Sequence, residues 1–248
     1  MFENLITMAT AVLAGRLYLS GLYRRYRAFF LFLVFQVSRG VALAPLDTAG
    51  STYQKVWVLT EPLQWVFYVL VVLEIFALVL HDYRGLSTVG RWSLLISVVI
   101  AMIAAGVTLL APTHAPDQSR LMSCIYMAER AIYFSLAVFL LTILGVLLQY
   151  PISLTSNIIR HSLIFCIYFV SSTFIYHLLA AGGIGVMTAV RVSMDSVDLV
   201  VLAAWLVLLN PAGEQRKKTL RPSWMPGREE ELVRQLSSLN LTLQALLS

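Results

Sequence analysis

The chain has 248 residues, of which 59% are hydrophobic and only 12% are charged, with a net charge of +5. Soluble domains carry about 25% charged residues, so this composition excludes an ordinary water-soluble globular protein and makes lipid the main solvent. The mean hydropathy is +0.79. The length suits one compact bundle rather than two large domains.

Apolar segments long enough to cross a bilayer recur along the chain. A spanning helix needs about 20 predominantly apolar residues, and turn-forming Pro, Gly, Asn and Asp residues separate the candidates. No strand-like alternation of polar and apolar residues is visible. We therefore predict an all-α polytopic membrane protein, a seven-helix bundle with transmembrane helices at approximately Asn4–Tyr23, Phe29–Leu46, Val56–His81, Trp92–Ala111, Leu121–Tyr150, Asn157–Ala181 and Met187–Asn210.

Basic residues are distributed unevenly between the two sides of this predicted bundle. If the N-terminus is outside, the cytoplasmic loops and tail hold twelve of the eighteen Lys and Arg residues, and the external loops hold only Lys55 and Arg120. The positive-inside rule then predicts an external N-terminus and a cytoplasmic C-terminus. We expect an integral, multi-pass protein of the cell membrane whose positive charge faces anionic lipids at the cytoplasmic side, and we expect no nucleic-acid binding.

Ionisable side chains lie within several of the predicted helices. Such residues cost about 2.5–3.5 kcal/mol each on insertion scales and usually serve a function. At a rise of about 1.5 Å per residue, most of them fall at similar depth, in the outer half of the bundle. Arg191, Asp195 and Asp198 also share one helix face. We predict an outer polar chamber for a ligand or ion, lined by Arg39, Glu61, Trp65, Tyr68, Glu129, Arg130, His177, Arg191, Asp195 and Asp198.

Two interpretations of these charges remain open. Three cations and four carboxylates are close to balance, so they can form ion pairs that fix helix packing. Alternatively they line a water-filled pocket, whose walls are commonly aromatic. Two further polar residues are assigned elsewhere: Glu74, near the inner end of its helix, is expected to pair with an interfacial arginine, and His161, beside Arg160 at the inner interface, is expected to be solvated.

Signatures of metal and phosphate chemistry are missing from the sequence. The four histidines are scattered, no HExxH pair or GxxxxGK[ST] loop occurs, and the two cysteines, Cys124 and Cys166, lack metal-ligand spacing. We therefore expect no metal, no cofactor and no catalytic residues, and we favour a non-enzymatic protein.

The chain divides into a transmembrane domain, residues 1–211, and a cytoplasmic segment, residues 212–248. Glu214–Arg221 is basic, and a short amphipathic helix is predicted after it. Leucines recur there with coiled-coil spacing. We predict that they bind a second copy of the chain or a protein partner, with docking on the inner leaflet or on the bundle as alternatives; they are Leu232, Leu236, Leu239, Leu243 and Leu246.

These features suggest function only by class. We favour a sensor or receptor-like module, or a membrane subunit of a larger complex, in which the chamber binds a ligand and the tail contacts a partner. The alternative is a small-molecule or proton/ion-coupled transporter, with Glu129 and Asp198 as its coupling carboxylates. A membrane enzyme acting on lipid or isoprenoid substrates is the least favoured class.

Overall fold

The computed structural model describes residues 2–46, 50–80, 92, 94–96, 99, 103, 117–149, 153–182, 186–215, 217–219, 234, 237–238, 241–242 and 245. Almost all of these residues are helical, which confirms the predicted all-helical class. The helices are α1 (Phe2–Leu19), the 3-10 turn η1 (Leu22–Arg24), α2 (Arg27–Leu43), α3 (Ser51–Val79), α5 (Asp117–Gln149), α6 (Ser156–Gly182), α7 (Met187–Leu208) and the short α8 (Pro211–Gln215).

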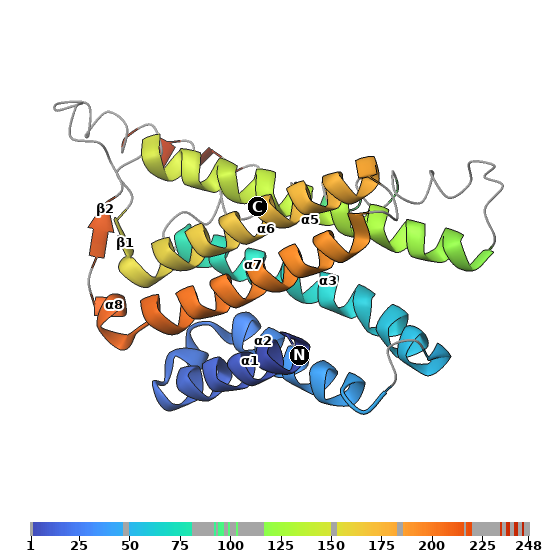
Figure 1. The fold of residues 1–248 in the computed structure, drawn as a ribbon. Helices are drawn as coiled ribbons and strands as arrows, with labels where there is room; N and C mark the ends of the chain where they lie inside the picture. Colours follow the sequence, from blue (N-terminus) through green and yellow to red (C-terminus); the bar gives the residue numbers. More distant parts are fainter. Residues whose placement is uncertain are drawn as a thin grey trace.

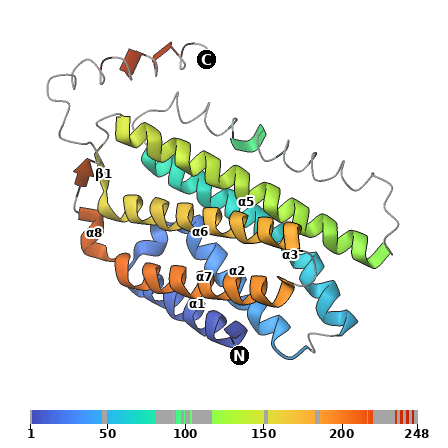
Figure 2. The ribbon, with the colours of Figure 1, turned by 45° about the horizontal axis from the view of Figure 1, so that its top comes forward.

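The long helices run side by side (Figure 1), and the contacts between them close a ring. Helix α1 packs against α2 and α7, α2 packs against α3, and α6 lies between α5 and α7. Helix α3 completes the ring through its contacts with α5 and α6, and the same neighbours are seen from a second direction (Figure 2). Any chamber that these helices enclose therefore lies inside the ring.

Among the residues that the structure describes, three helical segments are long and apolar enough to cross a membrane, namely Ser51–Val79, Ile125–Gly145 and Ser156–Leu179. Helices α1 and α2, with 18 and 17 residues, are at the lower limit for a hydrocarbon core about 30 Å thick, and α7 carries three charged residues. The fourth predicted span, 92–111, and the five predicted seam leucines of the tail lie largely or wholly outside the described residues.

Aromatic side chains form the centre of the bundle. Tyr68 of α3 packs edge-on against Tyr133 of α5 and Phe169 of α6, with ring centroids 5.6 and 5.5 Å away. His161 is fully buried, 4.5 Å from the Phe29 ring and 4.9 Å from the Phe165 ring. The prediction that His161 is solvated is therefore wrong, because α6 turns this residue inward.

Glu74 provides the N-terminal cap of α2 from a distant position in the sequence. Its carboxylate accepts hydrogen bonds from the backbone N–H groups of Ala28, at 2.8 Å, and Phe29, at 3.1 Å. Tyr26, at the capping position itself, makes no side-chain cap. The first N–H groups of a helix need external acceptors, so Glu74 serves the backbone where an arginine partner was expected.

A pair of short strands, which the sequence does not predict, joins the start of the tail to the connection before α6. Strand β1 (Ser153–Thr155) is antiparallel to β2 (Lys217–Thr219), with Leu154 opposite Lys218. Strand β1 leads directly into α6, and β2 follows α8. The first residues after the bundle are therefore held against it by backbone hydrogen bonds.

Side chains reinforce this attachment around Glu214 of α8. The Glu214 carboxylate accepts hydrogen bonds from the Tyr26 hydroxyl, at 2.5 Å, and from Asn157 Nδ2, at 3.0 Å, and it pairs with Arg25 Nε at 2.9 Å. Burial and this contact with Glu214 raise the pKa of the Tyr26 phenol, which keeps it a donor. We call these four residues the inner-end network.

Candidate functional site: a cavity enclosed by the helix ring

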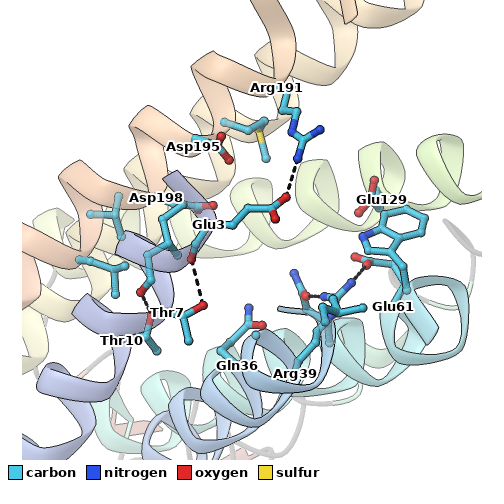
Figure 3. A pocket seen from close by; sticks show the side chains of 18 of the residues that line it. Glu3, Thr7, Thr10, Gln36, Arg39, Glu61, Glu129, Arg191, Asp195 and Asp198 are labelled. Carbon is cyan, nitrogen blue, oxygen red and sulfur yellow. Dashed lines mark hydrogen bonds and ion pairs between the residues drawn. The ribbon is translucent and has the colours of Figure 1, made fainter. Parts of the chain in front are cut away.

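A cavity of about 840 Å³ lies within the ring, lined by residues of α1, α2, α3, α5, α6 and α7. This volume is in the range of small-molecule binding sites, which are commonly about 300–1,000 Å³. Figure 3 shows polar side chains reaching into it from several helices. The cavity lies at the end of the bundle away from the inner-end network: Glu3, near the start of α1, and Arg191, near the start of α7, line it.

Seven of the ten residues predicted for the outer chamber line this cavity. They come from α2, α3, α5 and α7, and they are Arg39, Glu61, Tyr68, Glu129, Arg191, Asp195 and Asp198. The other three are not on its wall. Trp65 is buried, Arg130 is half-buried, and His177 is exposed.

In each of these three cases, the preceding residue lines the cavity instead. Gln64, Glu129 and Tyr176 face it, one position before Trp65, Arg130 and His177. Successive helical residues are rotated by about 100°, so one position is enough to turn a side chain off the wall. The cavity-facing stripe of α3 is Glu61, Gln64 and Tyr68, and that of α5 is Tyr126, Glu129 and Tyr133.

Arg39 and Glu61 form a buried ion pair across α2 and α3. Arg39 Nη2 lies 2.5 Å from Glu61 Oε2, and the two side chains are only 9% and 2% exposed. Arg39 also donates through Nη1 to the Gln64 side-chain oxygen, and Gln64 Nε2 donates to the Tyr68 hydroxyl at 2.9 Å. The Tyr68 and Tyr168 hydroxyls are 2.6 Å apart, so a continuous polar chain runs from α2 to α6.

The second arginine of the cavity is also paired, with a partner that the sequence does not suggest. Arg191 Nη2 lies 2.5 Å from Glu3 Oε1, which joins α7 to the start of α1. Both side chains are at least half exposed. Pairs of this kind contribute about 0–1 kcal/mol. Arg191 lies one helical turn before Asp195, yet its guanidinium bonds to Glu3.

Three carboxylates of the cavity have no cation partner within the part of the chain that the structure describes. They are Glu129, Asp195 and Asp198. Glu129 is only 2% exposed, and among the described residues nothing hydrogen-bonds to its Oε2 atom. Its carboxyl group faces Glu61 and the Tyr176 hydroxyl. A buried carboxyl oxygen without a donor costs free energy, so its position calls for a ligand, a proton or water.

Aromatic rings surround this part of the cavity. The Tyr126 ring lies 6.4 Å from the Trp57 ring and 6.2 Å from the Tyr176 ring, and Tyr133 lies 5.6 Å from Tyr176. We call Trp57, Tyr126, Tyr133 and Tyr176 the aromatic box. All four line the cavity, and Tyr126 and Tyr133 flank Glu129 on the same face of α5. Within the described ranges, no three His, Cys, Asp or Glu side chains gather as a metal site requires.

The first prediction concerns the stability that the buried Arg39–Glu61 ion pair contributes. Arg39→Met leaves the Glu61 charge without its cation, and Glu61→Gln leaves that of Arg39 without its anion, so each should lower the free energy of unfolding by about 3–5 kcal/mol. The double variant should lose much less than the sum, because neither charge is then left alone. Denaturant titration in detergent micelles measures all three values.

Arg191→Met is the matched control, since it breaks an exposed pair and should cost no more than about 1 kcal/mol. Additive losses in the double variant would show that Arg39 and Glu61 are not energetically coupled.

The comparisons with known proteins add no further constraint on this site. Comparison with protein-family models, curated proteins and solved structures finds no match to this chain. Any function therefore has to follow from the chemistry of the cavity and from the way the bundle is joined to its tail.

Proposed function

We propose that the chain is a receptor-like membrane module, or the membrane subunit of a larger complex, whose cavity binds a small polar ligand. The observation that carries this proposal is Glu129, which lines an 840 Å³ cavity and whose buried Oε2 atom has no hydrogen-bond donor among the described residues. A purely structural role explains the paired Arg39 and Glu61. A purely structural role does not account for Glu129, Asp195 and Asp198, which form no ion pair among the described residues.

A membrane topology of seven spans, with the N-terminus outside, is part of this proposal. The helix ring leaves Arg24, Arg25 and Arg160 near the inner-end network, together with Lys217 and Lys218 of β2. Clustered basic residues favour the cytoplasmic side. The cavity then opens in the outer half of the bundle, where a ligand from outside the cell can reach it.

This topology predicts how reporter fusions behave in a bacterial expression host. Green fluorescent protein fused after Ser248 should fluoresce, and alkaline phosphatase fused there should be inactive, because the positive-inside rule keeps the tail in the cytoplasm. An epitope placed before Met1 should be labelled on intact cells. Active phosphatase at the C-terminus, or an N-terminal epitope that is protected, contradicts the proposed orientation.

Helix α7 gives ligand binding a route to the tail. It presents Asp195 and Asp198 to the cavity and ends at Leu208, three residues before α8 begins. Helix α8 carries Glu214, which the inner-end network fastens to Tyr26 between α1 and α2. A shift of α7 on ligand binding would change these contacts, and a protein partner on the tail could detect that change.

A cavity-filling variant tests whether ligands bind here. Gln36 of α2 lines the cavity, whereas Val34 of the same helix is 42% exposed on the outside of the ring. Small polar molecules (amines, amino acids, carboxylates and sugars) are screened for those that raise the melting temperature of the purified full chain. Gln36→Trp should abolish the stabilisation because the indole occupies the ligand's volume, and Val34→Trp should preserve it.

Two results would contradict binding in the cavity. One is that no compound in the screen stabilises the wild-type chain. The other is that every stabilising compound acts equally on Gln36→Trp, which would place its binding elsewhere on the protein or in the detergent.

The transporter alternative is kept because Glu129 and Asp198 both line the cavity, and intramembrane carboxylates of this kind form proton relays in transporters. It predicts pH-driven flux of a proton or solute in reconstituted vesicles that is lost in Asp198→Asn and retained in Glu214→Gln, a change at the opposite end. Vesicles of the wild-type protein that show no flux count against transport and leave the receptor-like proposal standing.

A further inference from the structure

The charged residues that line the cavity are unequal in sign. Its wall contains five carboxylates and two guanidinium groups, and the described residues contribute no lysine or histidine to it. The carboxylates enter from α1, α3, α5 and α7, and Figure 3 shows them on several sides of the cavity. They are Glu3, Glu61, Glu129, Asp195 and Asp198.

Each of the two arginines is already bonded to one carboxylate, so together they neutralise only two of the five acids. Arg39 pairs with Glu61, and Arg191 pairs with Glu3. The remaining acids therefore give the cavity a formal excess of negative charge. An uncompensated charge in a low-dielectric interior is costly, and a cleft lined by charge of one sign concentrates ions of the opposite sign.

The surroundings of Glu129 match one particular class of cation. An ammonium group is attracted to the faces of Trp and Tyr rings within about 6 Å, and cages of such rings recognise amines and quaternary ammonium ions. The rings of the aromatic box form a row, Trp57–Tyr126–Tyr176–Tyr133, with neighbouring centroids 5.6–6.4 Å apart, and Tyr126 and Tyr133 lie on the same face of α5 as Glu129. Glu129 lines the cavity as well, and its Oε2 atom has no hydrogen-bond donor among the described residues.

The size of the cavity favours an organic cation over a bare metal ion. At about 840 Å³, it exceeds by far the roughly 30 Å³ that one water molecule occupies in the liquid. Much of the remaining wall is apolar or aromatic, including Phe32, Phe165 and Trp205. Such a wall stabilises a carbon skeleton attached to the charged group.

We propose that the cavity binds an organic amine, with its ammonium group held between Glu129 and the aromatic box. This inference rests on the proposed function, since it names the ligand class of the same cavity. Glu129 accepts the N–H hydrogen bond, and the rings of Trp57, Tyr126 and Tyr176 stabilise the positive charge. Asp195 and Asp198, on α7, draw cations into the cavity and place the ligand beside the helix that leads to the tail.

Three probes of matched size and different charge test this assignment. They are 2-phenylethylammonium, the neutral 2-phenylethanol and the anion phenylacetate, titrated calorimetrically into the full chain in lipid nanodiscs. The ammonium probe should bind most tightly and phenylacetate least. Glu129→Gln should weaken ammonium binding by roughly 10- to 100-fold, because it removes a charged hydrogen-bond partner of nearly the same shape. Trp57→Leu should weaken it as well.

Glu214→Gln is the control for loss of one carboxylate outside the cavity. Because Glu214 can act on the ligand only through α8 and α7, this change should weaken ammonium binding far less than Glu129→Gln does. Melting temperatures identify variants that fail to fold, and Gln36→Trp removes any signal that comes from the cavity itself.

The outcomes separate the two proposals. If the alcohol or the anion binds as tightly as the ammonium probe, and Gln36→Trp abolishes that binding, the cavity is a ligand site and the amine assignment is wrong. The same assignment is overturned if no ammonium binding occurs, or if Glu129→Gln binds the probe as the wild type does. Binding that survives Gln36→Trp argues against the cavity as the site, and so against both proposals.

Discussion

The buried Arg39–Glu61 pair is the interaction on which the rest of the cavity depends. It joins α2 to α3 inside the helix ring, where both side chains are almost fully buried and an unpaired charge would cost several kcal/mol. Because Arg39 is committed to Glu61 and Gln64, it is not available to Glu129 on α5. The pair therefore holds two helices together, and Glu129 beside it has no ion-pair partner among the described residues.

The same constraint shapes the inner end of the bundle. A bilayer offers no water to backbone groups, so helix ends near it need acceptors and donors from the protein. Glu74 supplies them for the start of α2, and Asn157 Nδ2 does so for the Asn210 carbonyl, at 2.7 Å. Gly213 follows from this packing, since a Cβ atom there would overlap the Asn157 side chain. Polar residues at this end of the bundle thus bond to other groups of the protein, whereas Glu129, Asp195 and Asp198 in the cavity form no ion pair among the described residues.

The sequence predicts the helices more reliably than the direction in which they face. Apolar runs and turn residues located α2, α3, α5, α6 and α7 to within a few residues, because those signals are local. The rotation of each helix about its axis is not local information, since a buried membrane helix is apolar on every side and lacks a polar face to orient it. Two assignments fell one position late for this reason, selecting Trp65 and His177 where Gln64 and Tyr176 face the cavity, and of the predicted neighbours Glu129 and Arg130 only Glu129 faces it.

The sequence is even less informative about which charged residues form ion pairs, because pairing depends on contacts between distant segments. Glu3 sits at the very start of the chain, and nothing local suggests that it meets Arg191, 188 positions later. That contact nevertheless determines which charged side chains of α7 have an ion-pair partner. With Arg191 bonded to Glu3, Asp195 and Asp198 on the same helix face form no ion pair among the described residues, and the near balance of cations and carboxylates read from the sequence becomes an excess of carboxylates in the cavity wall. An excess of that kind, in a wall that also contains aromatic rings, is the feature on which the proposed cation site rests, because ion pairing between helices does not require it.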